Sequence, residues 1–284
     1  SLPGGCAIGS RPINLHLEAL KRMGAKIKIK NGYIVASVKE NLIGASIRFP
    51  KISVGATENI LIASCFAKGK TKLRNCATEP EVKDLVIFLK KIGCKIKWVS
   101  ERGLDVIGVK NFKSASHKII FDRIEAGTYI IASAITKGSL KIKNIEPKYM
   151  HTEISLLKKM GINIEKKGGC VIVKKPKKIK KINLSTKPYP GFPTDLQAQI
   201  MTLMTQAEGT SAIKENIFEN RFMHVSELRR MGANIDISGN EAKIYGKNKL
   251  NGAELMATDL RASVSLVLAG LAANGKTIIN RIYH

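Results

Sequence analysis

The stretch "LEALKRMGAKIKI" (residues 17–29) decides the fold, because it joins two hydrophobic patterns through a single glycine. Its first half carries apolar residues at the spacing of an amphipathic helix, and its second half alternates lysine with isoleucine as a half-buried strand does. Gly24 stands between the halves, where helices commonly end in a glycine. The stretch therefore predicts a helix, a glycine stop and a strand.

The same pattern returns three times along the chain. It is found in "IFLKKIGCKIKWV" (87–99), "SLLKKMGINIE" (155–165) and "SELRRMGANIDI" (226–237). Successive glycines of the four copies are 69, 68 and 71 residues apart. Self-similarity at a fixed period is typical of proteins built from repeated structural units. These stop glycines are Gly24, Gly93, Gly161 and Gly232.

A second element recurs between these copies: an almost wholly apolar helix, a glycine and a strand. The stretches "TDLQAQIMTLMTQAEGTSAI" (194–213) and "TDLRASVSLVLAGLAANGKTII" (258–279) are examples. A helix that is apolar all round is buried, so we expect these helices inside the core. The two markers together predict four α/β units of about 69 residues. The glycines of the second marker are Gly69, Gly138, Gly209 and Gly275.

The charge balance is strongly basic, with 48 Lys and Arg against 22 Asp and Glu and a net charge of +26. Such a field concentrates anions, so nucleic acid, anionic lipid and phosphorylated metabolites are candidate partners. Many lysines alternate with isoleucine, in "KIKIKNG" (26–32) and "KKPKKIKKI" (174–182), which indicates the solvent side of half-buried strands. Aromatic residues make up only 5% and do not interleave with the basic ones, which argues against a nucleic-acid scaffold.

The cysteines and the hydropathy pattern indicate a soluble protein of the reducing cytoplasm. The five cysteines are odd in number and contain no C-x-x-C pair, which argues against a disulfide framework and a zinc site. The longest apolar stretch, residues 262–273, is about half of what a bilayer crossing requires. No charged and then apolar leader opens the sequence. The cysteines are Cys6, Cys65, Cys76, Cys94 and Cys170.

The loop around Cys6 is the first candidate for chemistry. Glycines stand on both sides of the cysteine, no apolar periodicity runs through the loop, and Arg11 is close enough in sequence to stabilise a thiolate. A buried and inert cysteine is the alternative for any single free thiol. The loop favours a nucleophile or proton donor that acts on an anionic substrate.

Helix starts supply further candidates. Arg11 with Pro12, and Lys51 with Ser53, precede helices whose free N–H groups favour anions. Asp195 begins a helix, and for this residue capping is the favoured interpretation and a catalytic base the alternative. The same holds for Asp259 in the matching motif, while Arg221 and Arg261 are candidate clamps for a carboxylate or phosphate. His151 and His224 stand at matching positions of the repeat, which indicates a structural role. We therefore expect no metal site.

Five stretches carry a resemblance to a known family: "LPGGCAIGSRPINLHL" (2–17), "KISVGATENI" (51–60), "FPTDLQAQ" (192–199), "IFENRFMHV" (217–225) and "MATDLRASVSLVLAG" (256–270). Together they resemble the UDP-N-acetylglucosamine 1-carboxyvinyltransferases, a family of enolpyruvyl transferases. The match runs over essentially all 284 residues. The cysteine loop followed by Arg-Pro separates this family from the shikimate-pathway enolpyruvyl transferases, which share the fold without that loop.

The resemblance implies an α/β fold of two similar domains. Each domain is a three-sided prism, an inverse α/β barrel built from repeated βαβαββ units with the helices inside. Six units make up the whole fold, and four of them lie in this chain. We therefore expect residues 1–120 to form part of a first domain with the cysteine loop, and residues 121–284 to form most of a second domain with Asp195.

The resemblance also implies a reaction. The enolpyruvyl group moves from phosphoenolpyruvate to the 3'-hydroxyl of UDP-N-acetylglucosamine, and phosphate is released. This is the first committed step of peptidoglycan precursor synthesis, which links the family to cell-wall biogenesis, cell shape, cell division and inhibition by fosfomycin. Both partners are small molecules, and we expect no cofactor, no nucleic acid and no membrane.

Roles for individual residues follow only from the resemblance. Cys6 would donate a proton to the enol carbon and could hold a covalent phospholactoyl adduct. Asp195 would contact the sugar hydroxyl as its base, Ile217 would line the sugar site, and two arginines would face the enolpyruvyl carboxylate. The expected substrate-binding positions are Arg11, Pro12, Ile13, Asn14, Leu15, Lys51, Ile52, Ser53, Val54, Asp195, Ile217, Arg221 and Arg261.

Two departures from the family pattern bear on activity. Asn14 stands where the family commonly has aspartate, so a contact to the uracil or ribose keeps one acceptor and loses a charge. The family's phosphoenolpyruvate-binding lysine and its neighbouring asparagine precede Ser1, and a further phosphate-binding arginine follows His284. A catalytically incomplete fragment or remnant of the same fold is therefore the alternative to an active transferase.

Overall fold

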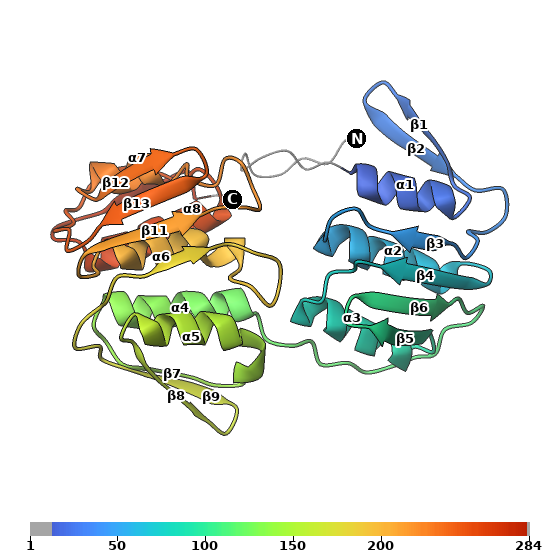
Figure 1. Cartoon of the computed structure of the whole chain (residues 1–284), viewed down its shortest axis with the longest axis horizontal. Coiled ribbons are helices and arrows are strands. Elements are labelled where there is room, and N and C mark those ends of the chain that lie inside the picture. The colour runs from blue at the N-terminus through green and yellow to red at the C-terminus, as the bar shows by residue number, and fades with distance from the viewer. Residues whose placement is uncertain (1–12, 283–284) are drawn as a thin grey trace. The chain divides into compact units, whose positions relative to one another are not determined.

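The computed structural model describes residues 13–282, which fall into two compact units, 13–120 and 121–282 (Figure 1). Each unit has a hydrophobic core of its own. In each unit, helices that follow the predicted apolar patterns pack against short sheets. No helix of the described part is long and apolar enough to cross a bilayer.

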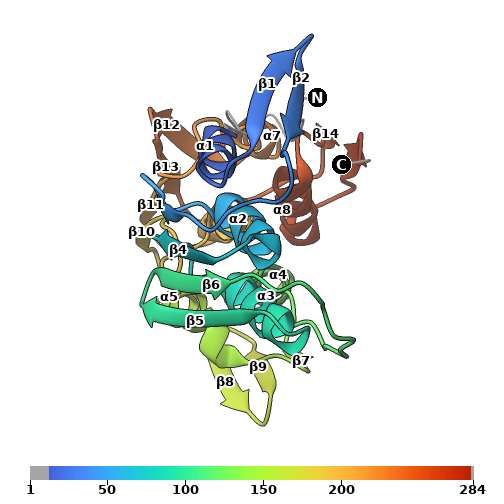
Figure 2. The same ribbon diagram turned by 90° about the vertical axis from the view of Figure 1, so that its right-hand side faces the viewer.

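The first unit consists of two sheets and three helices. The hairpin β1–β2 forms one sheet, and β3, β4, β6 and β5 form the other in that order, with β3 parallel to β4 and the remaining pairs antiparallel. Figure 2 shows β4, β6 and β5 alongside α2 and α3. The elements are α1 (Asn14–Arg22), β1 (Lys26–Lys30), β2 (Tyr33–Ser37), β3 (Ser46–Arg48), α2 (Val54–Phe66), β4 (Lys70–Arg74), α3 (Pro80–Lys91), β5 (Lys95–Ser100) and β6 (Gly103–Ile107).

The second unit repeats this plan with three sheets, ordered β7-β9-β8, β10-β11-β13-β12 and β14-β15. Its elements are α4 (Arg123–Ile135), β7 (Leu140–Ile142), the 3-10 turn η1 (Pro147–Met150), α5 (His151–Lys159), β8 (Asn163–Lys167), β9 (Cys170–Lys174), β10 (Asn183–Ser185), the 3-10 turn η2 (Thr194–Leu196), α6 (Gln197–Met204), β11 (Thr210–Lys214), α7 (Val225–Arg230), β12 (Asn234–Ser238), β13 (Glu241–Tyr245), β14 (Glu254–Met256), α8 (Leu260–Ala272) and β15 (Ile278–Asn280).

Three helices form the centre of the second unit. α4, α6 and α8 pack against one another, and the sheets lie around them (Figure 1). All eight residues of α6 are buried, which confirms the prediction from its apolar sequence. Because the three helices run from Asp122, Asp195 and Asp259 toward their stop glycines, their N-terminal ends carry the motifs singled out in the sequence.

The glycine stops are confirmed, since Gly24, Gly93, Gly161 and Gly232 have φ angles of 93°, 107°, 87° and 95°. Each lies between an amphipathic helix and an antiparallel hairpin. The second marker differs at one position. Lys137 takes the left-handed conformation, with φ of 52°, one residue before the expected glycine.

Three predictions of burial are only partly correct. Ile29 in β1 is 65% exposed, because β1 pairs only with β2. The stretch 174–182 is mostly loop, and only Pro176 and Ile179 in it are buried. Helix α2 leaves Ile62 and Phe66 exposed, because α1, α3 and the strands β4 and β6 contact only part of its circumference.

Candidate active site

Asp195 and two arginines form a charged cluster at the N-terminal ends of α6, α7 and α8. Arg221 Nη2 donates to Asp195 Oδ1 at 2.8 Å, and Arg261 Nη2 donates to Asp195 Oδ2 at 3.2 Å. The side chain of Arg221 is 4% exposed, whereas that of Asp195 is 43% exposed. Charge-assisted hydrogen bonds of this kind are stronger than neutral ones. The cluster therefore presents two cations beside a solvent-accessible carboxylate.

Asp195 differs from the residues at the matching positions of the other repeat units, because it does not cap its helix. Ser53, Asp122 and Asp259 begin α2, α4 and α8, and each side chain caps its helix by accepting from backbone N–H groups. Asp195 holds the matching position before α6 but lies inside the turn η2, and α6 has no side-chain cap. The prediction that Asp195 caps its helix is thus wrong, because its carboxylate pairs with the arginines, while the same prediction for Asp259 is confirmed.

Several of the buried polar atoms without a hydrogen-bond partner among residues 13–282 belong to residues close in sequence to this cluster. They include both amide atoms of Gln197, Oε1 of Gln199, Nε of Arg221 and Nε2 of His224. A buried polar atom left unpaired costs about 1–3 kcal/mol, so each one needs an explanation. Five such atoms belong to residues in or just before α6 and α7.

His224 lies against this cluster and is 1% exposed. Burial lowers the pKa of His224 to about 4, the charge of Asp259 opposes this shift, and the charge of Arg221 adds to it. The imidazole is therefore neutral at physiological pH. A neutral ring adds no third cation beside the two arginines.

In the first unit, two helix starts carry the expected substrate-binding residues. Ile13 and Asn14 open α1, with Asn14 exposed and the next residue, Leu15, packed into the core at 7% exposure. Lys51 is exposed before α2, and Ser53 caps that helix. The two starts are neighbours, since a Cβ added at Gly55 of α2 would lie 3.6 Å from His16 of α1. Ile52 is half-buried and Val54 is 37% exposed.

Ile217 belongs to the second unit and lies in the loop between β11 and α7, where it is 37% exposed. The loop continues to Arg221, so Ile217 and Arg221 share one short segment. Cys6, Arg11 and Pro12 lie outside the described residues. The expected site residues that are described therefore divide into one group within each unit.

Some polar residues near Asp195 were missed by the sequence analysis. Gln199 Nε2 donates to the carbonyl of Asp195 at 2.9 Å and to Thr128 Oγ1 at 3.2 Å, which ties the turn before α6 to α4. A signal for it existed, because glutamines at positions 197 and 199 interrupt an otherwise apolar helix. The buried Glu215 had no such signal, because it directly follows a strand in a segment where charged and polar residues are frequent.

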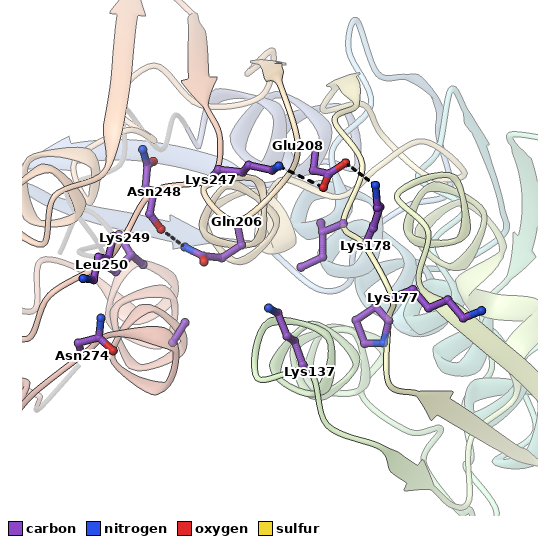
Figure 3. Close-up of a pocket in the computed structure, with 13 residues that line it drawn as sticks. Lys137, Lys177, Lys178, Gln206, Glu208, Lys247, Asn248, Lys249, Leu250 and Asn274 are labelled. Carbon is purple, nitrogen blue, oxygen red and sulfur yellow. Dashed lines mark hydrogen bonds and ion pairs between the residues drawn. The ribbon is translucent and has the colours of Figure 1, made fainter.

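A pocket of about 400 Å³ lies at the opposite ends of the central helices (Figure 3). There Glu208 pairs with Lys178 and Lys247, and Lys137 follows the end of α4. A lysine at a helix C-terminus offsets the negative end of the helix dipole, which accounts for Lys137, and the ion pairs with Glu208 account for Lys178 and Lys247. None of the expected site residues lines this pocket.

Comparison with known proteins identifies relatives over the whole chain. The family described as EPSP synthase (3-phosphoshikimate 1-carboxyvinyltransferase) matches residues 1–284. The UDP-N-acetylglucosamine 1-carboxyvinyltransferase of Pelagibacter ubique (strain HTCC1062) is 61% identical over 100% of this chain and 68% of its own length. The protein of the same name from Geotalea daltonii (strain DSM 22248 / JCM 15807 / FRC-32) is 52% identical over the same shares.

Solved structures share the fold. The enolpyruvyl transferase NikO from Streptomyces tendae superposes with a TM-score of 0.90 at 24% identity, covering 99% of this chain and 69% of that one. An EPSP synthase from Acinetobacter baumannii gives a TM-score of 0.73 at 20% identity, covering 97% and 68%. These structures confirm the expected α/β fold, and the curated relatives confirm the resemblance. The chain belongs to the family of UDP-N-acetylglucosamine 1-carboxyvinyltransferases.

Proposed function

We propose that this protein transfers the enolpyruvyl group of phosphoenolpyruvate to the 3'-hydroxyl of UDP-N-acetylglucosamine, with release of phosphate. The observation that carries the proposal is the pairing of Asp195 with both Arg221 and Arg261. It combines a candidate base with two cations suited to an anionic substrate. The names of the relatives supply the substrate class.

The reaction proceeds by addition and elimination. The sugar oxygen bonds to C2 of phosphoenolpyruvate while Cys6 gives a proton to C3, and Asp195 takes the hydroxyl proton. In the second stage the Cys6 thiolate takes a proton back from C3, the bond from C2 to the phosphate oxygen breaks with its electron pair leaving on phosphate, and the double bond between C2 and C3 re-forms. Charge develops on the phosphate and the carboxylate, and fixed cations stabilise it.

In this proposal, the pairing of Asp195 with the arginines determines the order of events. Before substrate binds, the carboxylate of Asp195 occupies both arginines. The carboxylate of phosphoenolpyruvate competes for the same two guanidinium groups and takes the place of Asp195. Once released, the carboxylate of Asp195 has free oxygens that can accept the proton of the sugar hydroxyl.

The first unit contributes the nucleotide end of the site in this proposal. The starts of α1 and α2 offer free backbone N–H groups and the positive ends of two helix dipoles, and Lys51 adds a side-chain cation. A UDP-sugar carries a diphosphate, which such helix ends favour. Work in peptidoglycan precursor synthesis, a cytoplasmic location and sensitivity to fosfomycin follow if the proposal is correct.

A direct assay tests this proposal. The full-length protein is mixed with both substrates, and phosphate release and the enolpyruvyl sugar nucleotide are measured by colorimetry and mass spectrometry. Phosphate should appear only when both substrates are present, and Arg261→Gln should reduce it strongly. Arg229→Gln is the matched control, because Arg229 is bonded to the carbonyl of Ile235, away from the site. Absence of both products in the wild type would contradict the proposal.

A further inference from the structure

Glu215 is a buried carboxylate that the reaction described above does not use. It directly follows β11 and is 3% exposed. Its hydrogen-bond partners in the described part of the chain are neutral donors. Oε1 accepts from Thr186 Oγ1 at 2.8 Å, from the Ile217 N–H at 2.8 Å and from the Phe218 N–H at 3.3 Å, and Oε2 accepts from Thr194 Oγ1 at 3.1 Å.

These donors belong to three separate segments of the site. Thr186 follows the end of β10 and is fully buried. Thr194 is the residue directly before Asp195. Ile217 and Phe218 begin the loop that leads to Arg221. The side chain of Glu215 therefore connects the segment that carries Asp195 to the segment that carries Arg221.

Contacts extend from these segments to the ion pair itself. The carbonyl of Thr194 accepts from Arg221 Nη2 at 3.5 Å, the same nitrogen that pairs with Asp195. The guanidinium carbon of Arg221 lies 5.7 Å from the centre of the Phe218 ring. Both Thr194 and Phe218 donate hydrogen bonds to Glu215. The carboxylate of Glu215 therefore holds the two residues that contact the ion pair of Arg221 and Asp195.

We propose that Glu215 is a positioning residue, which sets the relative placement of Asp195 and Arg221 and the shape of the loop bearing Ile217. This inference rests on the proposed function. A carboxylate has acceptor sites on two fixed oxygens, so it holds several donors in one geometry. Displacement of a reacting group by 1 Å can cost about a hundredfold in rate, which gives the positioning a measurable consequence.

A matched pair of variants at Thr194 tests the hydrogen bond that joins Glu215 to the segment carrying Asp195. Thr194→Val keeps the shape of the side chain and removes only the hydroxyl donor, whereas Thr194→Ser keeps the donor. In the full-length protein we expect kcat to fall about tenfold in Thr194→Val, with the KM for UDP-N-acetylglucosamine changed less than about twofold. Thr194→Ser should restore kcat to near the wild-type value.

Glu215→Gln tests all three segments at once. Glutamine removes the negative charge and leaves one acceptor oxygen instead of two, so Thr194 loses its acceptor and the hydrogen bonds from the Ile217 and Phe218 N–H groups become weaker. We expect kcat to fall by about a hundredfold and the KM for the UDP-sugar to rise. Hydrogen exchange at the amides of Ile217 and Phe218, which is measured without substrate, should become faster.

A stability-matched control separates positioning from general weakening. Ile235→Val removes one buried methylene from β12, a strand that carries none of these hydrogen bonds, and should lower the melting temperature without changing kcat. Equal kcat values in Thr194→Val and wild type, or unchanged exchange at Ile217 in Glu215→Gln, would overturn the inference. Lack of phosphate release by the wild type would instead refute the proposed function, and hydrogen exchange would still decide the role of Glu215.

Discussion

Arg221 Nη2 lies 2.8 Å from Asp195 Oδ1, although the two residues are 26 positions apart in the sequence. The arginine is buried and the carboxylate is half exposed. A buried guanidinium needs an anionic partner, and Asp195 supplies one. The pair thus holds the start of α6 beside the segment that leads into α7.

The first prediction concerns the proposed competition between Asp195 and phosphoenolpyruvate for the two arginines. Asp195→Asn removes the charge that competes for both arginines, so phosphoenolpyruvate should bind about tenfold more tightly, which corresponds to about 1.4 kcal/mol. Turnover should fall by about a hundredfold or more, because the base is lost. Calorimetry in the presence of the UDP-sugar measures the binding, and phosphate release measures the turnover.

The control for this prediction is Asp236→Asn, which changes the net charge equally. Asp236 is an exposed residue of β12 that accepts from the hydroxyl of Tyr245. It should leave both binding and turnover unchanged. Weaker phosphoenolpyruvate binding in Asp195→Asn would show that Asp195 does not compete for the arginines.

The second prediction concerns the cap of α8. Asp259 accepts from the N–H groups of Arg261 and Ala262 at 2.9 and 3.1 Å. Asp259→Ala should lower the free energy of unfolding by about 1 kcal/mol, measured by urea denaturation. Asp259→Asn keeps a capping oxygen and should lose much less. Equal losses in the two variants would mean that the cap is not what Asp259 contributes.

The third prediction concerns pH. Burial lowers the pKa of His224 from 6.5 to about 4. Between these values the unfolded chain binds a proton that the folded chain does not, so stability falls as the pH drops through this window. Above pH 6.5 the His224 ring costs the folded state no stability. As the pH falls toward 4, the free energy of unfolding decreases, and below pH 4 the decrease levels off at roughly 3 kcal/mol.

Urea denaturation at several pH values tests this expectation. His224→Asn removes the titrating ring, so its free energy of unfolding should depend less on pH between 4.5 and 6.5 than that of the wild type. His151→Asn, at the matching position of the repeat and exposed, is the control and should follow the wild type. An unchanged slope in His224→Asn would contradict the assignment.

The fourth prediction concerns Cys6. Cys6→Ala should abolish formation of a covalent adduct with phosphoenolpyruvate while leaving the melting temperature nearly unchanged, because the sequence around Cys6 lacks the apolar periodicity of a core element. Intact-mass measurement and a thermal melt check both statements. Unfolding of Cys6→Ala would mean that the thiol is structural.

The repeat and the fold class could be predicted from the sequence because they depend on local rules. Gly24 and Gly232 end helices for the same backbone reason, and hydrophobic spacing identifies each element. Exposure was harder to predict, because that of Ile29 depends on which strands lie beside β1. The spacing of hydrophobic residues identifies a helix or a strand. Whether both faces of that element are buried depends on the elements that pack against it.

The site could be predicted only in part. Asp195 and Asp259 share the local motif T-D-L, and local rules predict a cap at both positions. What separates them is that Asp195 meets Arg221 and Arg261, which are 26 and 66 positions away. Glu215 was missed for the same reason, since two of its donors, Thr194 and Thr186, stand 21 and 29 positions before it. Contacts of this range follow from the tertiary fold.

The central claim is that this protein performs enolpyruvyl transfer through Cys6 and Asp195. Its most direct test is intact-mass spectrometry of the chain after incubation with phosphoenolpyruvate and UDP-N-acetylglucosamine, followed by peptide mapping, on this chain and on the full-length protein. The account predicts an adduct on Cys6, and none on the other four cysteines. Absence of any adduct on Cys6 in both proteins would contradict it.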